Sequence, residues 1–478
     1  MKNIFESLIL ILVAGLVMQS LPAQAQSDGN LVVDSRRSLI VSELSILKNF
    51  TLKRTMDQLA AQAAVPGLTG EKLFRQWFDI LNPKAESFTQ GPHCDDELDV
   101  LTGLGILNSF PFTCRPGSKF SEGMEASLPT NPIDGYVPIT LTNRFDVAPS
   151  NGRNCGEHRI VYARSSGITD DRNRNFLIFE AALPNPFPEQ GLKGCKMVVK
   201  FWAQLTKEND LLKRAKQLEN FYYLGLAPFK PVVHIGNYGE NPQSDGQIRT
   251  NQFMQPRSEF TSGVWTLREY KLRVTKGLSA VIQPATVKTN PFGPLFQSGN
   301  LHPLAAEFQD YFLTQVRSLA TTDFSFNYVV PDRFNTGQSQ ANGAENNYVT
   351  QLGGDSSPFG QRIQEELDRL GSPLTPTEIV SRAQSQSCAG CHRLNSNPGF
   401  SEAQRALGGG LVFSTSLDFT HSGERAKEFV NGQEAWVISK VLTEMLLPAR
   451  KKIMVDFLED KLKHPNNPNS PINGKSHH

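Results

Sequence analysis

Six cysteines limit how this chain of 478 residues can fold more than any other feature of its sequence. Two of them lie close together, and the other four are spread over the first half of the chain at Cys94, Cys114, Cys155 and Cys195. In an oxidising compartment an even set of cysteines forms disulfides, with buried free thiols as the alternative. We expect the pairs Cys94–Cys114 and Cys155–Cys195, because each closes a local loop. Closing a loop of roughly 20 residues stabilises a fold by about 3 kcal/mol in the chain-entropy model.

The N-terminus indicates such a compartment. Lys2 gives a short positive start, residues 8–18 are apolar, and Ala23-Gln24-Ala25 matches an A-x-A cleavage site. The apolar run falls short of the roughly 18 residues that a membrane span needs, although a signal anchor is the alternative. We therefore predict a signal peptide over residues 1–25, cleaved before Gln26, and a periplasmic or secreted protein. No later segment is apolar enough to span, so no membrane insertion is expected.

Charge excludes a further class of partner. The chain carries 48 Lys and Arg against 47 Asp and Glu, and the two signs are interleaved along it. A nucleic-acid-binding protein usually shows a basic stripe, and none is visible here. We expect no nucleic-acid partner.

The sequence pattern predicts an α+β fold. Residues 36–82 show helical spacing of apolar residues, and residues 84–134 are rich in Gly, Pro, Ser and Asn. From Tyr136 onward there are β-type runs bounded by turn residues, among them YVPITLTNRF, HRIVYAR, RNFLIFEAAL and PVVHIGN. We predict a helical N-terminal segment with loops over residues 26–134, followed by a β-rich domain over 135–295. This domain is sandwich-like, tied by disulfides and carries inserted helices. A mainly α-helical C-terminal domain over 296–464 and a disordered tail over 465–478 complete the chain.

The last third contains the motif that can carry chemistry, Cys388-Ala-Gly-Cys391-His392. Upstream, Thr375-Pro376-Thr377-Glu378 is a capping box with proline at the first helical position, so we expect a helix that runs directly into the motif. Residues three and four apart on a helical turn share a face, which points Cys388, Cys391 and His392 the same way. Covalent haem needs this arrangement, with two thiols near its two vinyl groups and an imidazole that reaches the iron. The small residues between the cysteines keep the turn slim enough for a flat macrocycle.

The stretch EIVSRAQSQSCAGCHRLN resembles the haem-binding segment of c-type cytochromes. The resemblance implies haem c bound through thioethers at Cys388 and Cys391, with His392 as the proximal iron ligand. It also implies that residues 296–464 form a cytochrome c-like haem domain. The Gly-Pro-Leu stretch usual after such a motif is missing, and the nearest feature is Gly408-Gly409-Gly410-Leu411.

Other interpretations of the motif remain open. Cys388 and Cys391 can form a plain disulfide or a thioredoxin-like redox pair, although the preceding pattern is helix rather than strand. Zinc binding lacks a second pair of cysteines. No nucleophile elbow, glycine-rich phosphate loop or H-E-x-x-H zinc motif appears, so the sequence leaves open whether the chain is an enzyme.

The function expected from this sequence is one-electron transfer through a covalently bound haem, with the β-rich domain docking a redox partner protein that the sequence does not name. One alternative is a secreted binding or surface-interaction protein without a cofactor, in which the two cysteines of the motif form a structural disulfide. The other is a mono-haem oxidoreductase with an open iron position.

A carrier haem usually has a sixth iron ligand, and three residues downstream of the motif are candidates. Met445 and Met454 lie in an expected helix over about 434–462, kinked at Pro448, where methionine is more often core filler. In LVFSTSLDFTH, an extended chain turns His421 to the same side as Leu411 and Phe419. We therefore expect His421 as the sixth ligand, with Met454 or Met445 as the alternatives.

Overall fold

The computed structural model describes residues 32–115, 122–129, 132–170, 173–239, 245–252, 265–324, 326–341, 345–397, 399–415 and 422–462. From Val33 onward the chain forms one compact unit. The predicted signal peptide, the predicted tail and His421 lie outside the described residues, so the structure does not bear on them.

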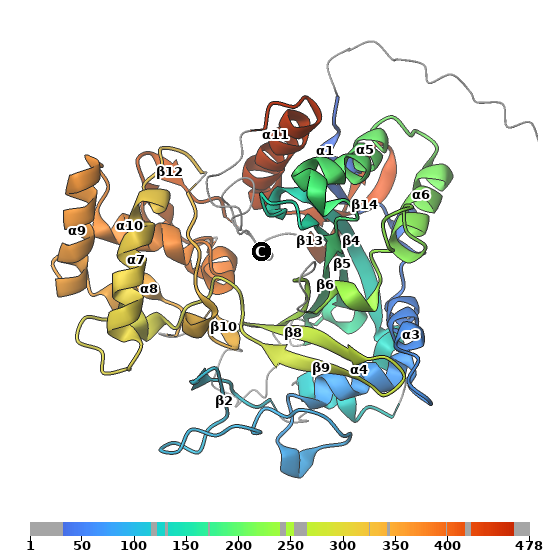
Figure 1. Ribbon diagram of the computed structural model, residues 1–478, viewed down its shortest axis with the longest axis horizontal. Helices are drawn as coiled ribbons and strands as arrows, with labels where there is room; N and C mark the ends of the chain where they lie inside the picture. Colours follow the sequence, from blue (N-terminus) through green and yellow to red (C-terminus); the bar gives the residue numbers. More distant parts are fainter. Residues whose placement is uncertain are drawn as a thin grey trace, which may run out of the picture. The chain divides into compact units, whose positions relative to one another are not determined.

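One eight-stranded antiparallel sheet organises this unit (Figure 1). Its strands are β1 (Ile40–Val41), β4 (Tyr136–Arg144), β5 (Asn154–Arg164), β6 (Asn175–Pro184), β7 (Gln247–Gln252), β8 (Thr266–Thr275), β9 (Ser279–Ala285) and β10 (Gln338–Gln340). Their order is β1-β4-β5-β6-β7-β8-β10, and β9 also pairs with β8. Strands β9 and β10 therefore share one edge of β8, each along a different half of it.

Helices from the first half of the chain lie beside the sheet (Figure 1). They are α1 (Ser35–Ser38), α2 (Leu44–Leu47), α3 (Leu52–Ala63), α4 (Gly70–Asp79), α5 (Lys196–Gln204) and α6 (Leu211–Tyr223). Alternate residues of the strands meet them in an aromatic core, where Trp77 of α4 lies 6.0 Å from Phe179 and 5.7 Å from Tyr270, measured between ring centroids. Because side chains alternate along a strand, the intervening residues occupy the opposite face of the sheet.

The C-terminal third contributes the helices α7 (Ala305–Leu319), α8 (Tyr348–Leu352), α9 (Pro358–Leu370), α10 (Pro376–Gln384) and α11 (Leu447–Leu458). It also contributes the hairpins β11 (Ala406–Gly408) with β12 (Leu411–Val412) and β13 (Ser422–Val430) with β14 (Gln433–Ile438). A third small sheet, β2 (Ile106–Leu107) with β3 (Phe110–Pro111), lies in the loop-rich N-terminal region.

The mixed α and β content agrees with the sequence, but three expectations differ from the structure. The described strands give one large sheet and three small hairpins rather than a sandwich. PVVHIGN forms a 3₁₀ turn at Ile235–Asn237 rather than a strand. The helix expected from residue 434 begins only at Val441, because Asn431 and Gly432 adopt positive φ angles of 50° and 76° and close the β13–β14 hairpin.

Both predicted disulfides are confirmed. Cys94 is bonded to Cys114, and Cys155 to Cys195, with Cα atoms 5.1 and 5.4 Å apart. The second bond ties β5 to the start of α5. Disulfides of this kind fit an extracellular or periplasmic location. A helix with the length and apolar character needed to cross a membrane is not present in the described ranges.

Candidate functional site

The CAGCH residues lie on a helical turn of their own rather than at the end of α10. That helix ends at Gln384, and a π-helical turn covers Gly390–Leu394. The backbone N–H of Cys391 donates to the carbonyl of Ser387 at 2.9 Å. Gly390 is required because a Cβ there would lie 1.7 Å from the carbonyl oxygen of Gln384. The glycine therefore lets the turn pack closely against α10, which is a different reason from the macrocycle clearance expected from the sequence.

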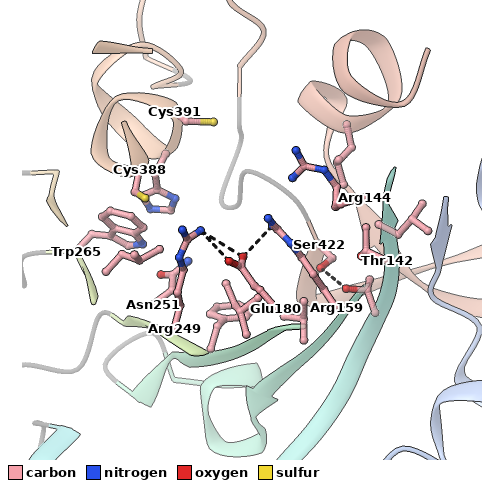
Figure 2. Close-up of a pocket in the computed structure, with 18 of the residues that line it drawn as sticks. Thr142, Arg144, Arg159, Glu180, Arg249, Asn251, Trp265, Cys388, Cys391 and Ser422 are labelled. Atoms are coloured by element: carbon pink, nitrogen blue, oxygen red, sulfur yellow. Dashed lines mark hydrogen bonds and ion pairs between the residues drawn. The ribbon is translucent and has the colours of Figure 1, made fainter. Parts of the chain in front are cut away.

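Cys388, Cys391 and His392 line one pocket, as their spacing predicts. The sheet forms the opposite wall, with Arg159 and Arg249 pointing from β5 and β7 toward the two cysteines (Figure 2). The space between the walls, including the open mouth, is about 910 Å³. The cavity proper is smaller, about 90 Å³, which is below the roughly 300–1,000 Å³ of small-molecule and cofactor sites.

The pocket wall combines apolar and cationic side chains. The apolar residues are Ile40, Val161, Phe176, Ile178, Trp265, Leu267 and Leu442. The charged residues are Arg144, Arg159, Arg174, Glu180, Arg249 and Arg450. Haem has a flat apolar ring and two carboxylates, so this wall matches its chemistry in both respects.

Burial sets the protonation state of the three motif side chains. It raises the pKa of the Cys388 thiol and that of the Cys391 thiol to about 12 in each case. Burial, helped by the charges of Arg174 and Arg393, lowers the pKa of His392 to about 3. At neutral pH the site thus offers two protonated thiols and a neutral imidazole, and a neutral imidazole is the form that binds a metal.

An aromatic residue of the sheet-side wall orients the imidazole. The rings of His392 and Trp265 stack with centroids 4.1 Å apart and planes 15° from parallel. Trp265 also belongs to a small apolar cluster with Leu267, Cys388 and Ala389. The backbone N–H of Ala389 donates to the Ser339 hydroxyl at 3.0 Å, which anchors the motif to β10. The motif is therefore fixed to the sheet side of the pocket at Ala389 and at His392.

Cross-strand ion pairs hold the arginines of the sheet face. Arg159 lies directly opposite Glu180, and Arg249 directly opposite Glu269, in the strand register. Arg159 contacts Glu180 at 2.9 Å, and Arg249 contacts Glu180 at 3.2 Å and Glu269 at 2.8 Å. Opposite charges in direct register stabilise a sheet, and these pairs also place cations under the pocket.

The candidates for a sixth iron ligand fall in different places. Among the described residues of the pocket wall, His392 is the only imidazole, and neither Met445 nor Met454 is part of this wall. Met445 accepts a hydrogen bond from the Ser414 backbone N–H at 3.5 Å, and Met454 is buried in α11. His421 precedes Ser422, a wall residue whose hydroxyl hydrogen-bonds Thr140 at 3.4 Å, but its own place stays a prediction.

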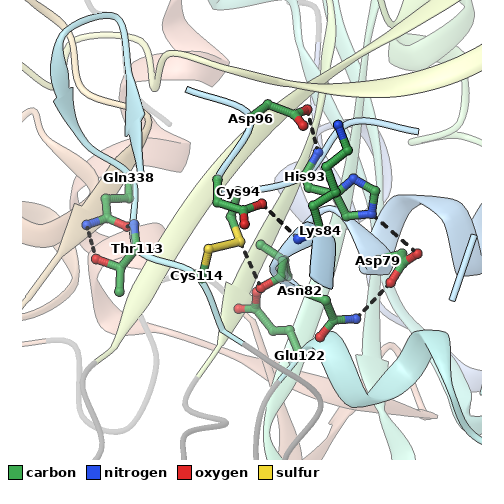
Figure 3. Close-up of a disulfide and its surroundings, with 12 residues drawn as sticks. Asp79, Asn82, Lys84, His93, Cys94, Asp96, Thr113, Cys114, Glu122 and Gln338 are labelled. Atoms are coloured by element: carbon green, nitrogen blue, oxygen red, sulfur yellow. Dashed lines mark hydrogen bonds and ion pairs between the residues drawn. A yellow bond between two sulfur atoms is a disulfide. The ribbon is translucent and has the colours of Figure 1, made fainter. Parts of the chain in front are cut away.

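The loop around the first disulfide does not form a metal site among the described residues. Cys94, Asp95 and Cys114 gather their ligand atoms within 4.8 Å, but both sulfurs belong to the disulfide and cannot act as thiolate ligands. Asp95 accepts the backbone N–H of Lys84 at 2.8 Å, and Asp96 accepts that of His93 at 2.7 Å (Figure 3). The acidic residues of this loop therefore have a structural role.

In comparisons with known proteins, no family model, curated protein or solved structure matches the chain.

The sequence reasoning missed the sheet-side wall of the pocket. Four charged residues of this wall, and the Glu269 partner of one of them, each fall within a strand and interrupt its pattern. The wall residues are Arg144, Arg159, Glu180 and Arg249. A buried charge in a strand needs a partner, so these interruptions, recurring in five strands, were the signal that one sheet face carries ion pairs.

Proposed function

We propose that this chain is an exported c-type haem protein that transfers single electrons. The observation that supports it is that Cys388, Cys391 and His392 share one pocket wall. The two cysteines would each form a thioether, and His392 would bind the iron through its neutral imidazole. When bound, haem supplies an iron that cycles between two oxidation states.

Residues of this chain would set the environment of that centre. Trp265 holds the imidazole plane by stacking on His392, and burial keeps the imidazole neutral. Apolar residues of the pocket wall such as Ile178 and Leu267 would help to exclude water from a bound haem. The β-rich part then serves both as a pocket wall and as the surface on which a redox partner protein would dock.

An oxidoreductase with an open iron position is the second candidate function. It is favoured by the described pocket wall, which contains no imidazole besides His392 and no methionine. Added cyanide or imidazole should shift the absorption spectrum at once if the position is open. In a carrier with His421 as the ligand, the shift should be slow in the wild type and fast in His421→Ala.

A cofactor-free binding protein with a Cys388–Cys391 disulfide differs from the structure, in which both residues are free thiols.

The first prediction distinguishes these functions by the colour of the purified protein. The protein purified from an export-competent host should be red, and the colour should stay with the denatured chain during extraction with acidified organic solvent. Thioether bonds survive this treatment, whereas a non-covalently bound haem leaves with the solvent.

Two variants sharpen this test. Cys388→Ala/Cys391→Ala should abolish covalent haem, measured by haem staining of a denaturing gel. Cys94→Ala/Cys114→Ala removes the same number of cysteines elsewhere and should keep it. A colourless wild-type protein, or colour that moves into the solvent, rules out the haem assignment.

A further inference from the structure

Three of the five arginines that line the pocket have ion pairs of their own. These pairs are Arg159 with Glu180 at 2.9 Å, Arg174 with Glu424 at 2.8 Å and Arg249 with Glu269 at 2.8 Å. Their charges are balanced within the fold, so they need no ligand.

The other two pocket arginines, Arg144 and Arg450, share a single carboxylate. Arg144 binds Asp146 through Nη2 at 2.9 Å, and Arg450 Nε lies 3.6 Å from the same carboxylate. The side chains are 1% and 4% exposed, respectively. Arg144 Nη1 and Arg450 Nη2 are buried and lack a hydrogen-bond partner among the described residues.

Among the described residues, Asp146 is the only carboxylate within ion-pair distance of either guanidinium group, although the charges of Glu157 and Glu180 also act on Arg144. Burial, together with the charge of Arg144, pushes the pKa of Arg450 well below its ordinary value. A buried cation with unsatisfied donors is unfavourable, and an anion between the two guanidinium groups would satisfy both. A guanidinium group is planar and binds a carboxylate through paired N–H donors, which makes a carboxylate the matching ligand.

We propose that Arg144 and Arg450 form a carboxylate clamp on the pocket wall. Both arginines line the same pocket as Cys391 and act electrostatically on its thiol. The carboxylate is either a propionate of the haem, in which case the inference rests on the proposed function, or a free carboxylate that enters the pocket.

The test compares the holo-protein with variants at Arg450. Arg450→Met removes the donors but keeps Asp146 paired with Arg144, and Arg450→Gln serves if the first variant does not fold. Arg450→Lys keeps the charge, and Lys451→Met makes the same change of charge at an exposed neighbour on α11. Resonance Raman spectra follow the propionate bending band, which responds to hydrogen bonding.

If the clamp holds a propionate, the band shifts in Arg450→Met and stays in place in Lys451→Met. The reduction potential of Arg450→Met should then also vary with pH between about 5 and 8, because the propionate loses the cation that keeps it ionised. If the clamp holds a free carboxylate, added succinate shifts the haem absorption band of the wild type saturably, and Arg450→Met weakens this binding at least about tenfold.

A band that does not move, together with no succinate effect, overturns the clamp. Failure of the haem assignment is recognised separately, because the wild-type protein then carries no covalent haem. In that case calorimetric titration of the haem-free protein with succinate tests the clamp directly. Binding that is lost in Arg450→Met and kept in Lys451→Met supports it, and no binding to the wild type overturns it.

Discussion

Two histidines, one buried in the core and one half-buried in the pocket wall, show how removal from water favours the neutral imidazole in this protein. Burial lowers the pKa of both His158 and His392 to about 3. His158 is 1% exposed, stacks on Trp202 with planes 4° apart and accepts a hydrogen bond from the indole N–H at 3.2 Å. Its role is structural, because it lies in the aromatic core and is not part of the described pocket wall. The same residue type thus packs the core at one position and lines the pocket at the other.

His158 should make the fold sensitive to acid. Its pKa in the folded state is about 3, against an ordinary value of 6.5 for histidine, so the folded chain binds fewer protons than the unfolded chain between these values. Stability is therefore lost as pH falls through this window, by roughly 3 kcal/mol at pH 4. His158→Phe keeps the stacked ring but leaves the Trp202 N–H unpaired, which should cost about 1–3 kcal/mol at pH 7.

Urea unfolding at pH 7 and pH 4 checks this prediction. The variant should be less stable than the wild type at pH 7, and its stability should fall less between the two values. An equal loss in both proteins would show that His158 is not the group that titrates. His234 is half-buried and lies outside the aromatic core, so His234→Phe is a control that should keep most of the pH dependence.

At the scale of elements, the two disulfides should contribute unequally. The Cys155–Cys195 bond spans 40 residues and the Cys94–Cys114 bond spans 20. In the chain-entropy model, the longer loop gives about 4 kcal/mol and the shorter one about 3 kcal/mol. Cys155→Ala/Cys195→Ala should therefore lower the free energy of unfolding more than Cys94→Ala/Cys114→Ala, measured by urea denaturation. The opposite order would mean that native packing around Cys94, rather than loop length, decides the difference.

Elements were predictable where their signals are local. The capping box of Thr375 and Glu378 is present in α10, and the strands β4, β5 and β6 fall where the apolar alternation placed them. The β13–β14 hairpin also had a local signal, the Asn431-Gly432 pair, which the helical interpretation of this region overlooked. By contrast, the pocket depends on strand order and register, which join residues far apart in the chain, and no local pattern contains that information.

The same holds for the site. Cys388, Cys391 and His392 were found from the sequence because a single turn brings them together. Arg144 and Arg450 come from β4 and α11, more than 300 residues apart, and meet only because the C-terminal third packs on the sheet. The carboxylate that both arginines contact, Asp146, can be identified as their common partner only in the folded structure.

At the scale of the whole molecule, several contacts join the predicted β-rich domain to the predicted helical domain that begins at residue 296. Strand β10 pairs with β8, the Trp436 backbone N–H donates to the Ser42 carbonyl at 2.9 Å, and Arg36 contacts Glu428 at 2.7 Å. Arg174 and Glu424 form a further, buried pair. The C-terminal part therefore shares both backbone hydrogen bonds and buried charges with the sheet.

These contacts predict that residues 296–464 do not fold alone. Expressed by itself, the fragment would expose the edge of β10 and leave Glu424 and Arg450 without partners, which are strongly destabilising changes. It should show no cooperative unfolding and no haem incorporation, whereas residues 26–464 should unfold in one transition. Circular dichroism during urea titration, with haem staining of both samples, makes the comparison. A fragment that unfolds cooperatively and binds haem covalently would establish a separate haem domain, and the sheet would then be a docking surface rather than a wall that the pocket needs.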